Sequence, residues 1–232
     1  MRHESMASEG GQSEGTDAPT GVVVSENQPR SGVARMAKCL ARQVALALVS
    51  WRLVFYFFTS LLLDKEKAFA AASESIARIP GLRGVYSRQA FYRFTLAACG
   101  KDVYFGWQTV FSKTGARVGD GVYLGRRCSL GLVDLGANTM LSDGVQILSG
   151  RRQHGTEGDS EVPYKEQVQT FGRVRIGSNA WIGTSAVIMA DVGKSTIVGA
   201  GAVVIEPIPA SSLAAGVPAI VKRRFNQTER SG

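Results

Sequence analysis

His154 is the residue of this sequence best placed to act as a general base. It lies in "ILSGRRQHGTEGD" (147–159), and the other histidine, His3, lies at the N-terminus. A neutral imidazole can take the proton of a hydroxyl as that hydroxyl attacks an electrophile. A carboxylate would hold the required tautomer. The sequence does not select among its candidates, which are Glu157, Asp159, Glu161 and Glu166 in the same segment and Asp143 before it. The alternative is a solvated loop histidine without a role.

An aliphatic residue recurs every six positions on both sides of this segment. The series is Val118, Leu124, Leu130, Leu135, Leu141 and Ile147, then Ile176, Ile182, Ile188, Val192, Val198 and Val204. Glycine directly follows most of these residues. Between the two halves the rhythm is interrupted over 148–173, and His154 lies in this interruption.

A six-residue period is typical of a parallel β-helix with three flat faces. Each short strand places one aliphatic side chain inside the prism, and a small residue next to it relieves crowding at the corner. Three such units make one coil, and stacked coils form a solenoid with one continuous core. The pattern predicts a mainly β fold, a parallel β-helix of hexapeptide repeats over 102–208. We expect an extruded loop at 148–173, followed by a C-terminal turn and tail over 209–232.

The segment before the repeats has a different composition. Residues 33–98 hold ten basic and three acidic residues, so they supply +7 of the chain's net charge of +8. We expect 33–101 to be helical, with an aromatic, apolar run up to residue 63. Basic flanks favour a helix lying in the membrane interface, while Arg52 argues against a simple transmembrane helix. The alternative is packing against the protein. Residues 1–32 are predicted to be a disordered leader.

Several classes of protein are disfavoured by the composition. The three cysteines form no CxxC pair, and we expect no metal site and a reducing compartment. A zinc enzyme on a β-helix would need three histidine ligands, and only one is available in the folded region. The basic residues are not interleaved with aromatic residues on a repeat face, so we expect no nucleic-acid partner.

The segment "VRIGSNAWIGTSAVIMADVGKSTIVGAGAVVIEPIPASSLAAGVPAIVKRR" (174–224) resembles the C-terminal signature of the hexapeptide-repeat acyltransferases. Its Trp-Ile-Gly is similar to the branch of maltose, galactoside and nodulation-factor O-acetyltransferases and xenobiotic acetyltransferases. Segment 84–112 is similar to the lead-in of exopolysaccharide sugar O-acetyltransferases. The resemblance implies a left-handed β-helix, a homotrimer, and acetyl-CoA bound between neighbouring subunits.

The resemblance also implies roles for particular residues. His154 holds the place of the family's catalytic histidine, although His-Gly-Thr-Glu stands where close sugar acetyltransferases often have His-Pro-x-Asp. Pantetheine would meet the final coils, and phosphates would meet basic groups near the C-terminus. Ile220 stands where many relatives carry a lysine, and the alternative for the basic cluster is a solvated helix end. The matching positions are Gly183, Thr184, Ala200, Gly201, Gly216, Pro218, Lys222 and Arg223.

The prediction is an enzyme that moves acetyl from acetyl-CoA, as co-substrate and without a metal, to a hydroxyl of a sugar or glycan precursor. His154 acts as base in a ternary complex. The expected partners are two further copies of the chain, a sugar acceptor and a membrane surface reached through 33–63. We expect a cytoplasmic protein, peripheral at the inner face of the cell membrane. The alternatives are a non-catalytic β-helix scaffold at the membrane and an amine acceptor.

Overall fold

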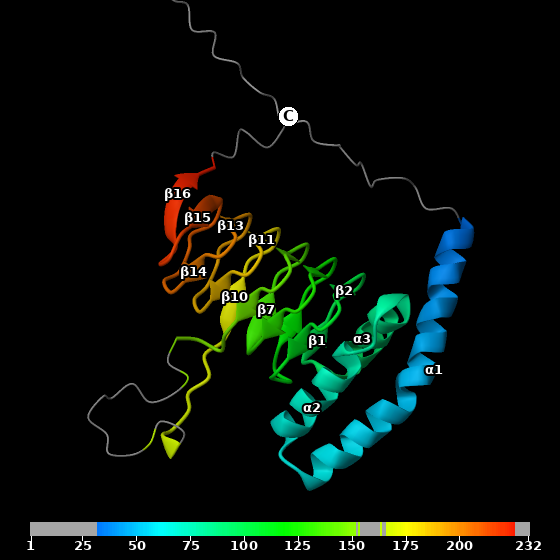
Figure 1. The fold of residues 1–232 in the computed structure, drawn as a ribbon. Coiled ribbons are helices and arrows are strands. Elements are labelled where there is room, and N and C mark those ends of the chain that lie inside the picture. The colour runs from blue at the N-terminus through cyan, green and yellow to red at the C-terminus, as the bar shows by residue number, and fades with distance from the viewer. Residues whose placement is uncertain (1–31, 152, 154–162, 164–165, 226–232) are drawn as a thin grey trace, which may run out of the picture.

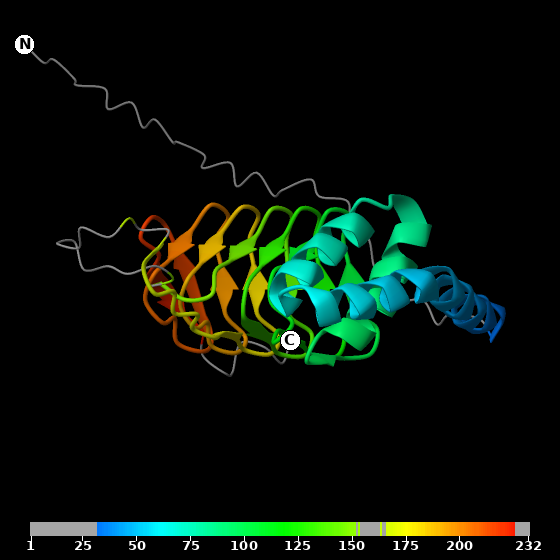
Figure 2. The ribbon, with the colours of Figure 1, turned by 90° about the horizontal axis from the view of Figure 1, so that it is seen from below.

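A computed structural model describes residues 32–151, 153, 163 and 166–225 of the 232-residue chain. The predicted disordered leader lies outside the described residues except for Gly32. Three helices come first, α1 (Gly32–Leu62), α2 (Lys65–Ala77) and α3 (Gly81–Thr95). A solenoid of short strands follows, with the helices packed at its first coil (Figures 1 and 2).

The strands come from successive coils and stack into three parallel sheets. Sheet A contains β1 (Ala98–Cys99), β4 (Arg117–Val118), β7 (Val133–Leu135) and β10 (Val174–Ile176). Sheet B contains β2 (Tyr104–Phe105), β5 (Tyr123–Leu124), β8 (Met140–Leu141), β11 (Trp181–Ile182), β13 (Ile197–Val198), β15 (Ser212–Ala215) and the antiparallel β16 (Ile220–Arg224). Sheet C contains β3 (Val110–Phe111), β6 (Ser129–Leu130), β9 (Gln146–Ile147), β12 (Val187–Ile188) and β14 (Val203–Val204).

The six-residue rhythm forms the core of this solenoid, as predicted. The twelve aliphatic residues of the series are all buried, none more than 3% exposed. Equivalent residues stack from coil to coil, as when Leu141 pairs with Leu124 below it and Ile182 above it. The chain turns between faces at residues in the left-handed region, including Asn138 with φ 57° and Gly201 with φ 66°. The predicted left-handed parallel β-helix, here about six coils, is confirmed.

The interruption in the rhythm is a loop that leaves the corner between sheets C and A. It departs after β9 and returns at β10, and its described residues 166–171 run out from the coils (Figure 1). Its neck is narrow: the Gly172 amide donates to the Ser149 carbonyl at 2.9 Å, and the Thr170 amide donates to the Gln153 carbonyl at 3.2 Å. Arg151 anchors the neck to coil five through Glu206 and the Ile205 carbonyl. The β-helix therefore continues unbroken beneath the loop.

The helices close the N-terminal end of the prism. An aromatic cluster joins α1, α2 and α3 to the first coil, made of Tyr56, Phe69, Phe91, Tyr92, Phe105 and Phe111. The α3 helix ends at Thr95, earlier than the end near residue 100 that the sequence suggested. The chain is already extended at Ala98–Cys99, where it pairs with β4 and forms the first rung of sheet A.

Candidate active site

Six of the predicted cofactor-binding residues lie along one corner of the prism. This B–C corner, between sheets B and C, contains Gly183 and Thr184 in coil four, Ala200 and Gly201 in coil five, and Gly216 and Pro218 in coil six. The register places residues 184, 200 and 216 directly above one another, because Ile182 pairs with Val198 and Val198 with Ala214. All six except Gly183 are exposed. Residues distant in sequence thus form one continuous edge.

Close backbone contact between coils explains the glycine at position 183. A Cβ there would lie 2.5 Å from the amide nitrogen of Ala200. Coils five and six are also in close backbone contact. The Val203 amide donates to the Gly216 carbonyl at 3.0 Å, and the Ala219 amide donates to the Val203 carbonyl at 2.8 Å. Gly216 has φ 102°, a left-handed conformation that disfavours a side chain. The "AAGVPA" segment therefore supplies the last turn of this corner.

The backbone amides of Thr184 and Ala200, at the B–C corner, have no protein acceptor among the described residues. In coil two the Arg126 amide donates to Asp143 Oδ1, one coil above, at 2.7 Å. The same register places Ala200 above Thr184 and Gly216 above Ala200, and neither residue has a side-chain acceptor. The exposed Thr184 and Ala200 N–H groups are therefore free to donate to a ligand carbonyl. Such donors suit the amide-containing arm of coenzyme A.

The two predicted phosphate contacts lie apart from the other six residues. Lys222 and Arg223 are on β16, an exposed strand antiparallel to β15. The alternative of a C-terminal helix end is wrong, because β15 offers an unpaired sheet edge with which 220–224 pairs. From Ile220, which pairs with Ala215 beside the corner, β16 runs back across sheet B. Arg223 pairs with Leu213, so Lys222 is the nearer of the two cations to the B–C corner.

The three predicted catalytic residues, His154, Glu157 and Asp159, lie outside the described residues. In the sequence they come just after Gln153, the last described residue of the anchored neck on this side of the loop. Asp143, another candidate to orient the histidine, already accepts the Arg126 amide, and its Oδ2 lies 3.8 Å from Arg126 Nε. The described part of the chain holds no cluster of three or more metal-ligating side chains.

A thiol close to the B–C corner does not provide a nucleophile. Cys128 Sγ donates to the Ser142 carbonyl at 3.2 Å, and burial raises the pKa of its thiol to about 11. Only a thiolate is strongly nucleophilic, and this thiol remains protonated at neutral pH. Sequence analysis missed Ser142, whose Oγ accepts a hydrogen bond of 3.1 Å from Trp181 Nε1 and so holds the indole beside the corner.

Comparisons with known proteins support the predicted resemblance. The chain is 27% identical over 158 residues to the galactoside O-acetyltransferase of Escherichia coli K12, which covers 63% of this chain and 72% of that protein. The structure matches a maltose O-acetyltransferase from Clostridium difficile 630 with a TM-score of 0.62, at 22% identity over 72% of this chain and 89% of the other. The chain is thus similar in sequence and in fold to sugar O-acetyltransferases. No family model matches the sequence.

These relatives confirm the predicted class of enzyme, an acetyltransferase. A further solved structure with the same fold is a galactoside acetyltransferase in complex with coenzyme A. Its TM-score is 0.54, at 19% identity over 72% of this chain and 86% of the other. That protein and this chain therefore share the β-helix fold.

Proposed function

We propose that this chain transfers the acetyl group of acetyl-CoA to a hydroxyl of a sugar or glycan precursor. The observation that carries the proposal is the identity to a galactoside O-acetyltransferase over 158 residues. The B–C corner supports it, because exposed amides in coils four and five offer donors to the pantetheine arm. The non-catalytic scaffold is not favoured, because the relatives are enzymes.

The proposed reaction is a direct transfer within a ternary complex. The His154 imidazole takes the proton of the acceptor hydroxyl as its oxygen attacks the thioester carbonyl carbon. The tetrahedral oxyanion collapses, the carbon–sulfur bond breaks, and the imidazolium returns its proton to the leaving thiolate. Glu157 or Asp159 would stabilise the imidazolium. Gly183, Thr184, Ala200, Gly201, Gly216 and Pro218 would line the acetyl-CoA site, and Lys222 and Arg223 would approach its phosphates.

His154→Ala tests this mechanism. We expect turnover, followed by release of free thiol against a panel of sugars, to fall by about 10²–10⁴-fold. Binding of acetyl-CoA, measured by calorimetry, should be retained. His3→Ala is the matched control, since it removes the other histidine from the leader. Unchanged turnover in His154→Ala would exclude the proposed base.

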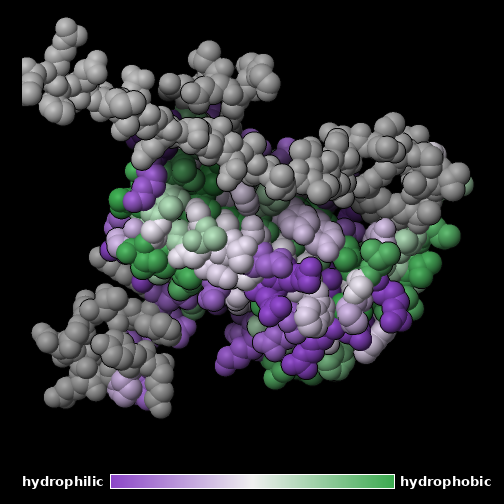
Figure 3. Space-filling model, turned by 45° about the horizontal axis from the view of Figure 1, so that its top comes forward, coloured by the Kyte–Doolittle hydropathy of each residue, from purple (hydrophilic) through white to green (hydrophobic). Residues whose placement is uncertain are grey.

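We also propose that α1 holds the protein at a membrane surface. Among the described residues, α1 is the one helix long and apolar enough to cross a bilayer, over Cys39–Leu62. One side of it, with Ala45, Val49, Leu53 and Tyr56, is buried in the cap. The other side is an exposed apolar stripe, visible in green at the right-hand edge of Figure 3. The stripe consists of Met36, Leu40, Val44, Leu48, Trp51, Phe55, Phe58 and Leu62.

The charge at position 52 does not interrupt this stripe. The Arg52 guanidinium lies 5.0 Å from the Trp51 ring centroid, and its terminal nitrogen donates to Ser75 Oγ of α2 at 3.4 Å. The stripe can therefore enter the acyl boundary while the charge is held against α2. The full-length protein should sediment with membranes on high-speed centrifugation of a lysate, and Leu48→Gln/Phe55→Gln should stay in the supernatant. Recovery of the unaltered protein in the supernatant would contradict the proposal.

A further inference from the structure

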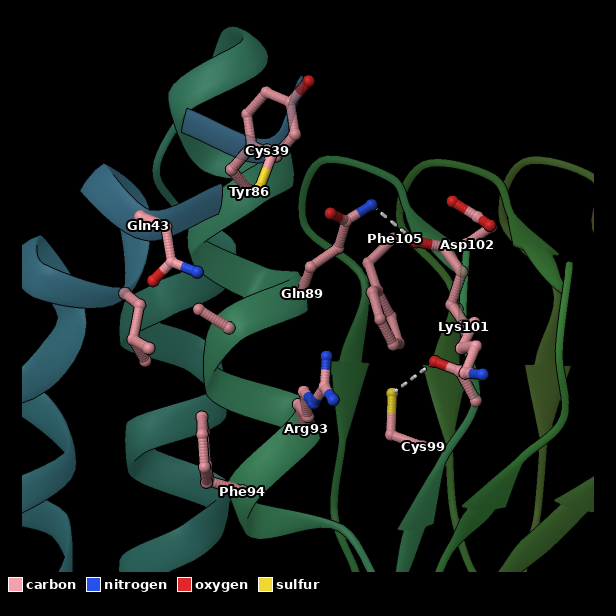
Figure 4. A pocket seen from close by; sticks show the side chains of 14 residues that line it. Cys39, Gln43, Tyr86, Gln89, Arg93, Phe94, Cys99, Lys101, Asp102 and Phe105 are labelled. Atoms are coloured by element: carbon pink, nitrogen blue, oxygen red, sulfur yellow. Dashed lines mark hydrogen bonds between the residues drawn. The ribbon is translucent and has the colours of Figure 1, made fainter. Parts of the chain in front are cut away.

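A cavity of about 520 Å³ lies between α1, α3 and the first coil, away from the B–C corner. Cys39, Gln43 and Leu46 line it from α1, Gln89 and Arg93 from α3, and residues 99–103 from the solenoid. Figure 4 shows these three elements facing one another across the space. Coils are spaced by about 4.8 Å, so coil one lies roughly 14 Å below coil four along the axis. The cavity is therefore distinct from the proposed acetyl-CoA site.

The cavity contains a buried hydrogen-bond acceptor without a partner among the described residues. Gln89 Nε2 donates to the Val103 carbonyl at 2.6 Å, which fixes the orientation of the amide because a carbonyl oxygen only accepts. Gln89 Oε1 is consequently turned away from Val103, towards the helices (Figure 4). An unpaired buried acceptor is unfavourable, because it has lost its hydrogen bonds to water. A ligand hydroxyl or N–H group would remove this cost.

Two cations border the same cavity and make no ion pair among the described residues. Arg93 and Lys101 line it, and Asp102 is the one carboxylate among its described lining residues, whose charges sum to +1. Burial raises the pKa of the Cys99 thiol to about 11, so this group adds no negative charge at neutral pH. Arg93 faces Cys99 and the first coil (Figure 4). Guanidinium and ammonium groups both form charge-assisted hydrogen bonds with phosphate.

We propose that this cavity binds a phosphate ester that carries a hydroxyl group. The phosphate contacts Arg93 and Lys101, and the hydroxyl donates to Gln89 Oε1. Apolar side chains complete the lining, including Leu46, Phe94 and Val103. A lipid head group and a soluble sugar phosphate share the required chemistry. The lipid is a candidate because Leu46 belongs to the same helix as the exposed apolar stripe. The inference does not depend on acetyl transfer.

The test uses the full-length protein and two probes. Glycerol 1-phosphate, titrated by calorimetry, represents the soluble ester. Vesicles of phosphatidylcholine, with or without phosphatidylglycerol, represent the lipid. Arg93→Gln/Lys101→Gln should weaken binding of the accepted probe about 10-fold or more, as expected for the loss of charge-assisted bonds. Arg83→Gln/Lys65→Gln removes the same charge from exposed positions of α3 and α2 outside the cavity and should bind like the unaltered protein.

The outcomes separate the two sources and the two proposals. Binding of glycerol phosphate that depends on Arg93 and Lys101 supports a soluble ester, and a dependence seen only with phosphatidylglycerol vesicles supports a lipid. Gln89→Met should weaken the same probe, because it removes the acceptor and keeps the length of the side chain. If neither probe distinguishes the cavity variant from its charge-matched control, the inference is wrong. Acetyl-CoA binding in the same variants shows whether the transfer site remains intact.

Discussion

Backbone amides at the corners follow a simple rule at the scale of single residues. An aspartate two positions after an inward-facing residue caps the amide of the equivalent residue one coil below. Asp143 caps Arg126 in this way, and Asp120 caps Lys101 at 2.6 Å. Where alanine or glycine takes the place of the aspartate, the amide below stays available. The sequence marks these small residues, but only the register between coils shows which amides they leave free.

Ala200→Asp tests this account of the acetyl-CoA site. The new carboxylate would cap Thr184 as Asp143 caps Arg126, and its charge would repel the cofactor. We expect KM for acetyl-CoA to rise about 10-fold or more without loss of the folded state, measured by steady-state kinetics and thermal melting. Ala210→Asp is the matched control. Its carboxylate would cap the Lys194 amide in the same way, but at the corner between sheets A and B, away from the proposed cofactor site. An unchanged KM in Ala200→Asp would place the cofactor elsewhere.

Buried thiols make the protein less stable in alkali. The pKa of Cys128 is raised by burial to about 11, from an ordinary value of 9.0. As pH rises from 9 to 11, the unfolded chain loses this proton while the folded protein keeps it. The folded state then binds more protons, so the free energy of unfolding falls with rising pH. Cys99 acts in the same direction.

Cys128→Ala should therefore show a shallower fall in the free energy of unfolding over this range, measured by urea denaturation at each pH. The exposed Cys39 serves as the control, because Cys39→Ala should keep the slope of the unaltered protein. Equal slopes for all three proteins would show that Cys128 ionises alike in the folded and unfolded states.

At the scale of elements, one buried arginine connects the cap to the prism. Arg88 is 1% exposed, and its guanidinium donates to the Phe105 carbonyl at 3.0 Å and to the Ile79 carbonyl at 2.8 Å. It thus bonds α3 to the first coil and to the segment that follows α2. Burial lowers the pKa of this arginine, but three carbonyl acceptors, including that of Ala77, keep the charge solvated.

Arg88→Met should destabilise the protein by about 2–4 kcal/mol, because it leaves these carbonyls buried without donors. Urea unfolding followed by circular dichroism measures the change. Arg83→Met, at an exposed position of the same helix, should change stability by less than about 0.5 kcal/mol. A similar small effect for Arg88→Met would mean that water replaces the guanidinium.

At the scale of the whole molecule, the outer face of sheet B differs from the other two faces. Large side chains, each between 37% and 45% exposed, form a ladder of Tyr104, Tyr123, Met140 and Trp181. The first two rings stack with centroids 4.8 Å apart. Sheet A instead carries charged pairs outside, such as Arg175 with Asp191. Exposed apolar surface of this kind is typical of a contact with another protein. The ladder also borders the B–C corner, so a neighbouring subunit there would enclose the cofactor.

Met140→Arg tests sheet B as the interface of the homotrimer that the resemblance predicts. A charge at this rung should shift the protein to the monomer, measured by light scattering after gel filtration. Gln146→Arg is the matched control, since residue 146 is also exposed in coil three but belongs to sheet C. A trimer that survives Met140→Arg would move the interface to another face.

The sequence by itself determined the solenoid, because one aliphatic residue per face every six positions is a local property. The helical nature of residues before the repeats and the loop after Ile147 follow from equally local patterns. The position of six cofactor candidates on one corner needed the stacking of coils, which joins residues 16 positions apart in coils four to six. The local pattern also did not show that the Arg52 guanidinium donates to Ser75 of α2. The unpaired Gln89 acceptor and the bonds of Arg88 arise only where α3 packs on the first coil, since burial and partners there come from distant segments.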